Sequence, residues 1–173
     1  MEFVPLPIHG AHGIIGETTS DLRGSLTRVW DKKLIFMDFD VAQSSFVLNP
    51  KSMTIRGLHF QIPPYSENKV VQCLSGKVFD VILDLREKSS TFKEHVTLEL
   101  GPKEKFLGVT VPAGCAHGYL TMEDNSTLIY FMDNEYSPEN SRGLFWNDPA
   151  LSIKWPDVPL FISERDSKWP LLG

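Results

Sequence analysis

The hydrophobic positions along the chain fall into short runs that are rich in β-branched and aromatic residues. These runs recur about every ten residues, with glycine, proline or polar turn residues between them, which is the spacing of an all-β sandwich or barrel. They are SLTRVWD, SSFVLN, TIRGLHFQ, KVVQCL, KVFDVILDLR, HVTLEL, FLGVTVP, HGYLTME and STLIYFMD. Helix signals are sparse. We therefore expect one jelly-roll domain that extends over residues 1–173.

Three local patterns predict details of this fold. Ser75 and Gly76, between two apolar runs, are typical of a tight hairpin. Lys77, Asp80 and Asp84 interrupt the run KVFDVILDLR, as polar residues do in a half-buried strand. Near the C-terminus, a serine three residues before an aspartate in ISERDSKWP predicts the cap of a short helical turn.

Composition and charge limit what the protein can bind. The chain is 42% hydrophobic and 23% charged, which is ordinary for a soluble globular protein, and its formal net charge is −5. Because no basic stripe is present to follow a phosphate backbone, we expect no nucleic-acid partner. A local cluster of arginines and lysines can still bind a small anion.

Other features of the sequence indicate the cellular compartment of the protein. No apolar segment is long enough to span a membrane, and the first residues, MEFVPLPIHG, do not resemble a secretion signal. Two cysteines, Cys73 and Cys115, make no disulfide framework. We therefore expect reduced thiols and a cytoplasmic protein with no membrane partner.

The run TIRGLHFQIPP carries two residues that a purely structural strand does not need, Arg56 and His59. Lys69 begins the next run. Taken singly, Arg56 and Lys69 read as surface charges, and His59 reads as a core histidine with one hydrogen bond. Strict alternation would also place Arg56 and His59 on opposite faces of the sheet. We expect them to share a site only if Gly57 supports a bulge or kink in the strand.

A second histidine, His117, follows a turn in VPAGCAHGYL. The spacing of Pro112, Gly114 and His117 resembles the second sequence motif of the cupins, whose fold is a small β-barrel. Metal-dependent cupins add an H-x-H pair and a glutamate from a first motif, but the upstream segment here, GLHF, holds a single histidine. Two histidines without a nearby third ligand make a poor transition-metal site. We therefore expect a site without a metal or another cofactor.

Two further residues allow either a structural or a chemical role. Tyr130, in STLIYFMD, is a packing residue with its hydroxyl at the surface or, if it faces the barrel interior, a proton donor. Asp166, in ISERDSKWP, either caps the C-terminal turn or acts as a catalytic carboxylate. The residue pattern alone leaves both alternatives open.

Taken together, these segments resemble the dTDP-4-dehydrorhamnose 3,5-epimerase family. The matching stretches extend from about Glu17 to Leu172 and are DLRGSLTRVWD, IRGLHFQIPP, ENKVVQCLSGKVFDVILDLREKSSTF, VPAGCAHGYLTMEDNS, YSPENSRGLFWNDPALSIKWP and ISERDSKWPLL. The resemblance implies a cupin-type jelly roll that is usually a homodimer. It also implies metal-free action on a nucleotide-linked 4-keto-6-deoxyhexose.

The resemblance assigns a role to each matching position. His59 corresponds to the general base, Tyr130 to the general acid, and Asp166 to the carboxylate that orients the base. The positions that hold the sugar nucleotide correspond to Arg23, Arg56, Lys69 and His117.

The chain departs from the commonest family pattern at positions that face the nucleotide. Arg28 and Ser141 stand in place of glutamates, Arg165 and Phe131 stand in place of lysines, and Asn49 remains from a longer Q-x-N loop. We still count Arg28, Asn49 and Arg165 among the expected substrate-binding residues. The nucleotide and the sugar therefore stay open, and inversion at C3, at C5 or at both is possible.

A reaction that inverts a carbon next to a carbonyl would require the residue types that the resemblance assigns to this site. A proton must leave one face of the ring and return to the other, which requires a base and an acid on opposite sides. A histidine titrates near neutrality, a carboxylate on its other nitrogen fixes its tautomer, and Lys69 can stabilise the enolate. Arg23 and Arg56 suit the two phosphates. The alternatives are a nucleotide-ketosugar isomerase on the same barrel and a non-catalytic cupin that binds a sugar or a metal.

Overall fold

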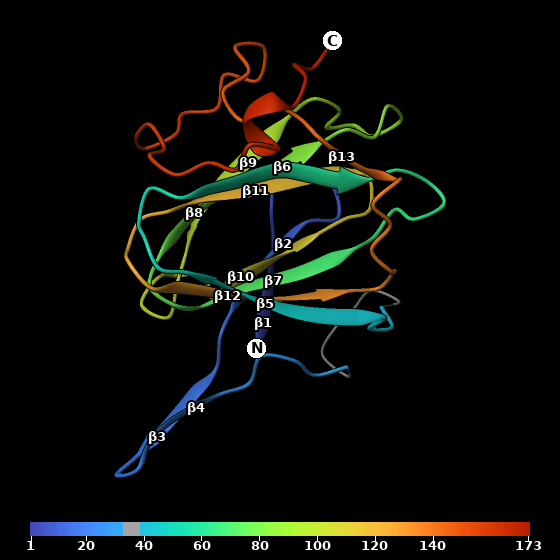
Figure 1. Ribbon diagram of the computed structural model, residues 1–173. Helices are drawn as coiled ribbons and strands as arrows, with labels where there is room; N and C mark the ends of the chain where they lie inside the picture. The colour runs from blue at the N-terminus through green and yellow to red at the C-terminus, as the bar shows by residue number, and fades with distance from the viewer. Residues whose placement is uncertain (33–38) are drawn as a thin grey trace.

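Two antiparallel sheets face each other in the computed structural model, which describes residues 1–32 and 39–173 (Figure 1). The first sheet has, in spatial order, β1 Glu2–Pro5, β2 His12–Ile15, β10 Gly108–Val111, β7 Lys69–Ser75, β12 Ser126–Met132 and β5 Gln43–Asn49. The second sheet has, in spatial order, β13 Ser141–Gly143, β6 Ile55–Gln61, β11 Cys115–Thr121, β8 Val78–Asp84 and β9 His95–Leu100. The expected all-β jelly roll is confirmed.

Two smaller elements lie outside these sheets. The strands β3 Thr18–Asp21 and β4 Gly24–Thr27 form a hairpin that projects away from the sandwich (Figure 1). A short 3-10 helix, η1 Asp166–Lys168, lies next to β6. Within the described part of the chain, no helix is long and apolar enough to cross a membrane.

All nine apolar runs of the sequence contain or overlap a strand. Four strands have no counterpart among those runs, and they are β1, β2, β3 and β13. Each of these is only three or four residues long. Such a segment has too few positions to show the alternation of a strand, and its pairing partner decides that it forms one.

The predicted hairpin at Ser75 and Gly76 is wrong. Gly76 does form a tight turn, with φ of 71°. However, β7 pairs with β10 and β12, whereas β8 pairs with β11 and β9 in the other sheet. The chain therefore crosses between the sheets at this turn. Turn residues indicate where the chain reverses, but they do not determine which strands then form hydrogen bonds.

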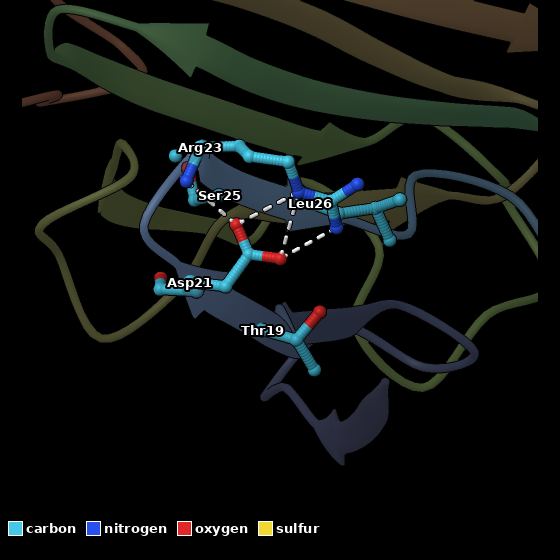
Figure 2. A pocket seen from close by; sticks show the side chains of 7 residues that line it. Thr19, Asp21, Arg23, Ser25 and Leu26 are labelled. Carbon is cyan, nitrogen blue, oxygen red and sulfur yellow. Dashed lines mark hydrogen bonds and ion pairs between the residues drawn. The ribbon is translucent and has the colours of Figure 1, made fainter.

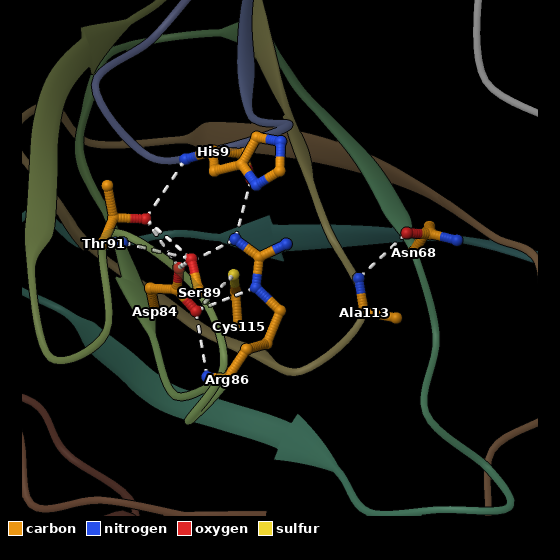
Figure 3. A network of polar contacts seen from close by, with 8 residues as sticks. All are labelled: His9, Asn68, Asp84, Arg86, Ser89, Thr91, Ala113 and Cys115. Carbon is orange, nitrogen blue, oxygen red and sulfur yellow. Dashed lines mark hydrogen bonds and ion pairs between the residues drawn. The ribbon is translucent and has the colours of Figure 1, made fainter.

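The interpretation of β8 as a half-buried strand is also wrong. Both of its carboxylates, Asp80 and Asp84, are fully buried. Asp84 accepts hydrogen bonds from Arg86 Nε at 2.8 Å, Ser89 Oγ at 2.5 Å and Thr91 Oγ1 at 2.7 Å (Figure 3). Burial by itself raises the pKa of Asp84, but these hydrogen bonds outweigh it and hold the pKa well below its usual range. A buried strand can carry carboxylates when such partners compensate them.

The main hydrophobic core lies between the two sheets. Val71 and Leu128 of the first sheet pack in one cluster with Val78, Ile82 and Tyr119 of the second. Both cysteines are free and buried, as expected for reduced thiols. Tyr119 belongs to this core and also lines a cavity beside it.

Candidate active site

A cavity of about 280 Å³ opens between the sheets, and we call it the central cavity. Its walls come from five strands, β6 and β11 of one sheet and β5, β7 and β12 of the other. The lining residues are Ser45, Val47, Arg56, His59, Lys69, His117, Tyr119, Tyr130 and Met132. Five of the ten residues predicted for the site therefore meet in one place.

His59 lies in the central cavity and forms a hydrogen bond with Asp166. Its Nε2 is 2.7 Å from Oδ1 of Asp166, whose side chain is buried. The other carboxylate oxygen accepts a hydrogen bond from the backbone N–H of Gly57 at 3.3 Å. Burial raises the pKa of Asp166, but the hydrogen bonds and the charge of His59 outweigh this effect and leave the pKa below its usual value. An ionised carboxylate is therefore fixed behind the imidazole.

A bulge in β6 brings Arg56 and His59 to the same cavity. The pairing of β6 with β11 shifts register at this point, and Gly57 has φ of 132°. A Cβ atom built on Gly57 would lie 2.5 Å from Cα of Gly118, so the strands approach this closely only with glycine. A bulge at Gly57 was the condition for Arg56 and His59 to share a site, and this bulge is present.

Tyr130 faces the barrel interior, on the opposite sheet from His59. Part of its surface is exposed, but protein surrounds its hydroxyl. This burial, together with the neighbouring Tyr119 and Asp80, raises the pKa of Tyr130 well above its usual value. The phenol therefore stays protonated near neutral pH, as a proton donor must.

A second histidine and carboxylate lie deeper in the barrel. Nε2 of His117 is 2.7 Å from Oδ2 of Asp80, and both side chains are buried. Oδ1 of Asp80 has no hydrogen-bond partner in the described residues. The His117 ring meets the Tyr130 ring edge to face, with centroids 6.2 Å apart. The predicted site residues did not include Asp80, although a carboxylate inside an apolar run was a signal for a special role.

Lys69 connects the central cavity to a smaller space of about 170 Å³, which we call the side recess. Its Nζ is 3.1 Å from Oε1 of Glu67, and both side chains are nearly buried. The side recess is lined by His59, Phe60, Gln61, Glu67, Lys69, Tyr136, Ser141 and Arg165. Arg165 donates hydrogen bonds to Ser141 Oγ at 2.7 Å and to Tyr136 Oη at 3.2 Å. Sequence reasoning assigned no role to Glu67 or Tyr136, although each begins a stretch that resembles the family.

Asn49 is buried and holds other site residues in place. Its Oδ1 accepts hydrogen bonds from Arg56 Nε at 2.9 Å and from the Tyr119 hydroxyl at 3.3 Å. Its Nδ2 donates to the backbone oxygen of Ser126 at 3.1 Å. Asn49 therefore orients Arg56, and its own predicted contact with substrate stays a prediction.

Two predicted residues lie away from the central cavity. Arg23 sits in the projecting hairpin, where its side chain is 90% exposed and pairs with Asp21 at 2.5 Å (Figure 2). Arg28 follows β4 and pairs with Asp31 at 2.6 Å. Within a single chain, the fold does not bring these two arginines to His59.

Within residues 1–32 and 39–173, no three His, Cys, Asp or Glu side chains gather in a way that could hold a metal ion. The expectation that the protein works without a metal or cofactor stays a prediction.

Comparisons with known proteins agree with this geometry. A family model described as dTDP-4-dehydrorhamnose 3,5-epimerase matches residues 5–173. The chain is 38% identical to the dTDP-4-dehydrorhamnose 3,5-epimerase of Sinorhizobium fredii over 157 residues, which cover 88% of this chain and 80% of that protein.

Two solved structures share the fold. The dTDP-4-dehydrorhamnose 3,5-epimerase of Bacillus anthracis, with TDP and PPi bound, has a TM-score of 0.93 and 32% identity over 99% of both chains. A 3'-monoepimerase of Streptomyces bikiniensis, in complex with dTDP-quinovose, has a TM-score of 0.87 and 28% identity over 96% of this chain and 86% of that one. The isomerase and the non-catalytic cupin are not favoured by these matches. The chain belongs to the dTDP-4-dehydrorhamnose 3,5-epimerase family.

Proposed function

We propose that this protein is an epimerase that inverts C3, C5 or both in a nucleotide-linked 4-keto-6-deoxy sugar. One observation carries the proposal. A histidine paired with an ionised carboxylate and a protonated tyrosine line the same cavity from opposite sheets. This is the arrangement that removal and return of a proton on two faces of a ring require.

The chemistry begins at His59. Because Nε2 carries the proton that bonds to Asp166, Nδ1 holds the free electron pair and removes a proton from the carbon next to the ketone. The electrons of that C–H bond form a C=C bond, and the ketone becomes an enolate. The ammonium group of Lys69 stabilises the negative oxygen. Tyr130 then returns a proton to the opposite face, and solvent restores both groups.

The nucleotide part is assigned to the cations around the cavities. Arg56 and Lys69 line the central cavity, and Arg165 lines the side recess. Guanidinium and ammonium groups are the usual partners of phosphates. A thymidine nucleotide is the first candidate, because TDP and dTDP-quinovose occupy the two related structures.

We also propose that the protein is a homodimer. In this dimer, Arg23 and Arg28 of one copy help to bind the substrate of the other copy. The hairpin of β3 and β4, which holds Arg23, projects away from the sandwich (Figure 1), and Arg28 directly follows β4. Neither arginine lines its own central cavity. Large apolar side chains lie exposed on this hairpin and on the edge strand β5, and these are Leu22, Leu26, Phe46 and Leu48. A second copy that covers them would receive the two arginines beside its own substrate.

We propose a cytoplasmic location for the protein. Cys73 and Cys115 are both buried, and neither forms a disulfide. Two free thiols in a chain of this size fit a reducing compartment.

Deuterium exchange tests the proposed reaction. The protein is incubated in D2O with dTDP-4-keto-6-deoxyglucose, and label at C3 and C5 is followed by NMR. We expect label at one or both carbons, loss of at least about 100-fold of the exchange rate in His59→Ala, and exchange without correct inversion in Tyr130→Phe.

The control is His95→Ala, which removes a histidine from β9, away from the central cavity. This variant should exchange at the wild-type rate. If the wild type introduces no label into this substrate or its cytidine and guanosine analogues, the proposed reaction is wrong. Full exchange in His59→Ala would overturn the assignment of the base.

A further inference from the structure

The C-terminal segment DSKWP places an indole directly beside the His59–Asp166 pair. Nε1–H of Trp169 donates a hydrogen bond to Oδ1 of Asp166 at 3.2 Å, and His59 Nε2 bonds to the same oxygen at 2.7 Å. The Trp169 and His59 rings also meet edge to face, with centroids 6.2 Å apart and an interplanar angle of 68°. Two donors thus share one carboxylate oxygen.

Three separate contacts fix the position of this indole. A Cβ atom built on Gly143 would lie 2.3 Å from Cε2 of Trp169, so the ring reaches β13 only because glycine is there. The guanidinium carbon of Arg165 lies 4.9 Å from the ring centroid, within the range of a cation–π contact. The next residue, Pro170, accepts a hydrogen bond from the backbone N–H of Phe145 at 2.8 Å. These contacts therefore fix the Trp169 N–H in its position beside Asp166.

We propose that Trp169 is a positioning residue that limits the basicity of His59 through their shared contact with Asp166. The inference rests on the proposed role of His59 as the base. A carboxylate oxygen that already accepts a hydrogen bond from another donor stabilises a neighbouring imidazolium less strongly. Trp169 therefore keeps Asp166 ionised and correctly oriented, and its N–H competes with the imidazole for the same carboxylate oxygen.

Other ionisable groups also face His59 and must stay constant in a test. Those in the central cavity are Arg56, Lys69, His117, Tyr119 and Tyr130, and those in the side recess are Glu67, Tyr136 and Arg165. A Trp169→Phe substitution removes the N–H donor and leaves all of these groups and an aromatic ring in place. The matched control is Trp155→Phe, since Trp155 donates its N–H to the backbone oxygen of Trp146 at 2.9 Å, away from Asp166.

The first readout needs no substrate. The His59 ring protons are titrated by NMR in the whole protein and assigned by their absence in His59→Ala. We expect the titration midpoint to rise by about half a pH unit in Trp169→Phe and to stay at the wild-type value in Trp155→Phe. A midpoint that does not move, or that falls, overturns the inference.

The second readout is the pH profile of deuterium exchange. We expect the rate of Trp169→Phe to fall about threefold near pH 6 and to change by less than about twofold near pH 9. An equal loss at every pH would indicate a purely structural role and would refute the inference. If the wild type exchanges no substrate, the proposed function fails, whereas the titration still decides whether Trp169 acts on His59.

Discussion

At the scale of single residues, Asp166 belongs to the C-terminal turn and its carboxylate also lies against His59. Its backbone N–H donates to Ser163 Oγ at 3.0 Å and so begins the C-terminal turn. Its carboxylate accepts hydrogen bonds from His59, Gly57 and Trp169. The turn fixes the backbone, and the fixed backbone aims the carboxylate at the imidazole, which supports the proposed role of Asp166 in orienting the base.

The Asp166→Asn variant tests the charge of this carboxylate. The pKa of Asp166 is lower in the folded protein than the usual value of 3.8, so its ionised form stabilises the fold above about pH 4. This contribution disappears as the pH falls through the folded-state pKa. We expect the wild type to be more stable than the variant by about 1–2 kcal/mol near pH 6, and the difference to approach zero near pH 2 in urea unfolding.

The same variant should also lose activity. An asparagine keeps the shape of the side chain but cannot stabilise an imidazolium, so we expect exchange to slow by about 100-fold or more. A stability difference that stays constant from about pH 6 to pH 2 would show that the charge of Asp166 does not stabilise the fold.

At the scale of elements, the bulge in β6 determines whether the site exists. Regular alternation along β6 would turn Arg56 and His59 to opposite faces. The positive φ of Gly57 and its close approach to Gly118 in β11 change that register. One backbone irregularity thus joins a base to a cation in one cavity.

A Gly57→Ala substitution tests this element, with Gly24→Ala as its match. Both glycines have φ of 132°, but a Cβ at Gly24 would have no atom within 4 Å. We expect Gly24→Ala to cost about 1–3 kcal/mol of unfolding free energy from backbone strain alone, and Gly57→Ala to cost about 1–3 kcal/mol more from the contact with β11.

Urea unfolding of both variants measures this difference. Exchange activity of Gly57→Ala, measured on the fraction that remains folded, should also fall because Arg56 and His59 move apart. Equal costs for the two substitutions would mean that β6 and β11 can separate without penalty at the bulge.

At the scale of the whole molecule, large apolar side chains are exposed where we propose that a second copy packs. Phe46 is 74% exposed on the edge strand β5, and Leu22 and Leu26 are exposed on the hairpin. Exposed large apolar side chains on an open edge strand, such as Phe46 on β5, often mark an interaction surface. That the chain forms a single domain stays a prediction.

The Phe46→Asp variant tests the proposed homodimer by sedimentation equilibrium. We expect a wild-type dimer at micromolar concentration and a dissociation constant at least about 30-fold higher in the variant, because a buried aromatic contact is replaced by a charge. Val158→Asp, which changes a similarly exposed apolar residue on the C-terminal loop, should stay dimeric. A wild type that is monomeric at every concentration would contradict the proposal.

The fold class could be predicted from the amino-acid pattern, because nine apolar runs of β-forming residues, separated by turn residues at regular spacing, are typical of an all-β sandwich or barrel. It also identified His59, Tyr130 and Asp166, although the residue pattern alone left their roles open and only the family resemblance assigned them. The condition for Arg56 and His59 to meet was likewise visible, since glycine interrupts their strand.

Which strands share a sheet, and which side chains share a cavity, could be read from the folded protein alone. Ser75 and Gly76 predicted a hairpin, yet the strands on either side pair with distant partners. Asp80 meets His117 although 37 residues separate them, and Trp169 packs against Gly143 of β13. Local patterns record turns and periodicity, whereas pairing and burial depend on long-range contacts that no short stretch of sequence contains.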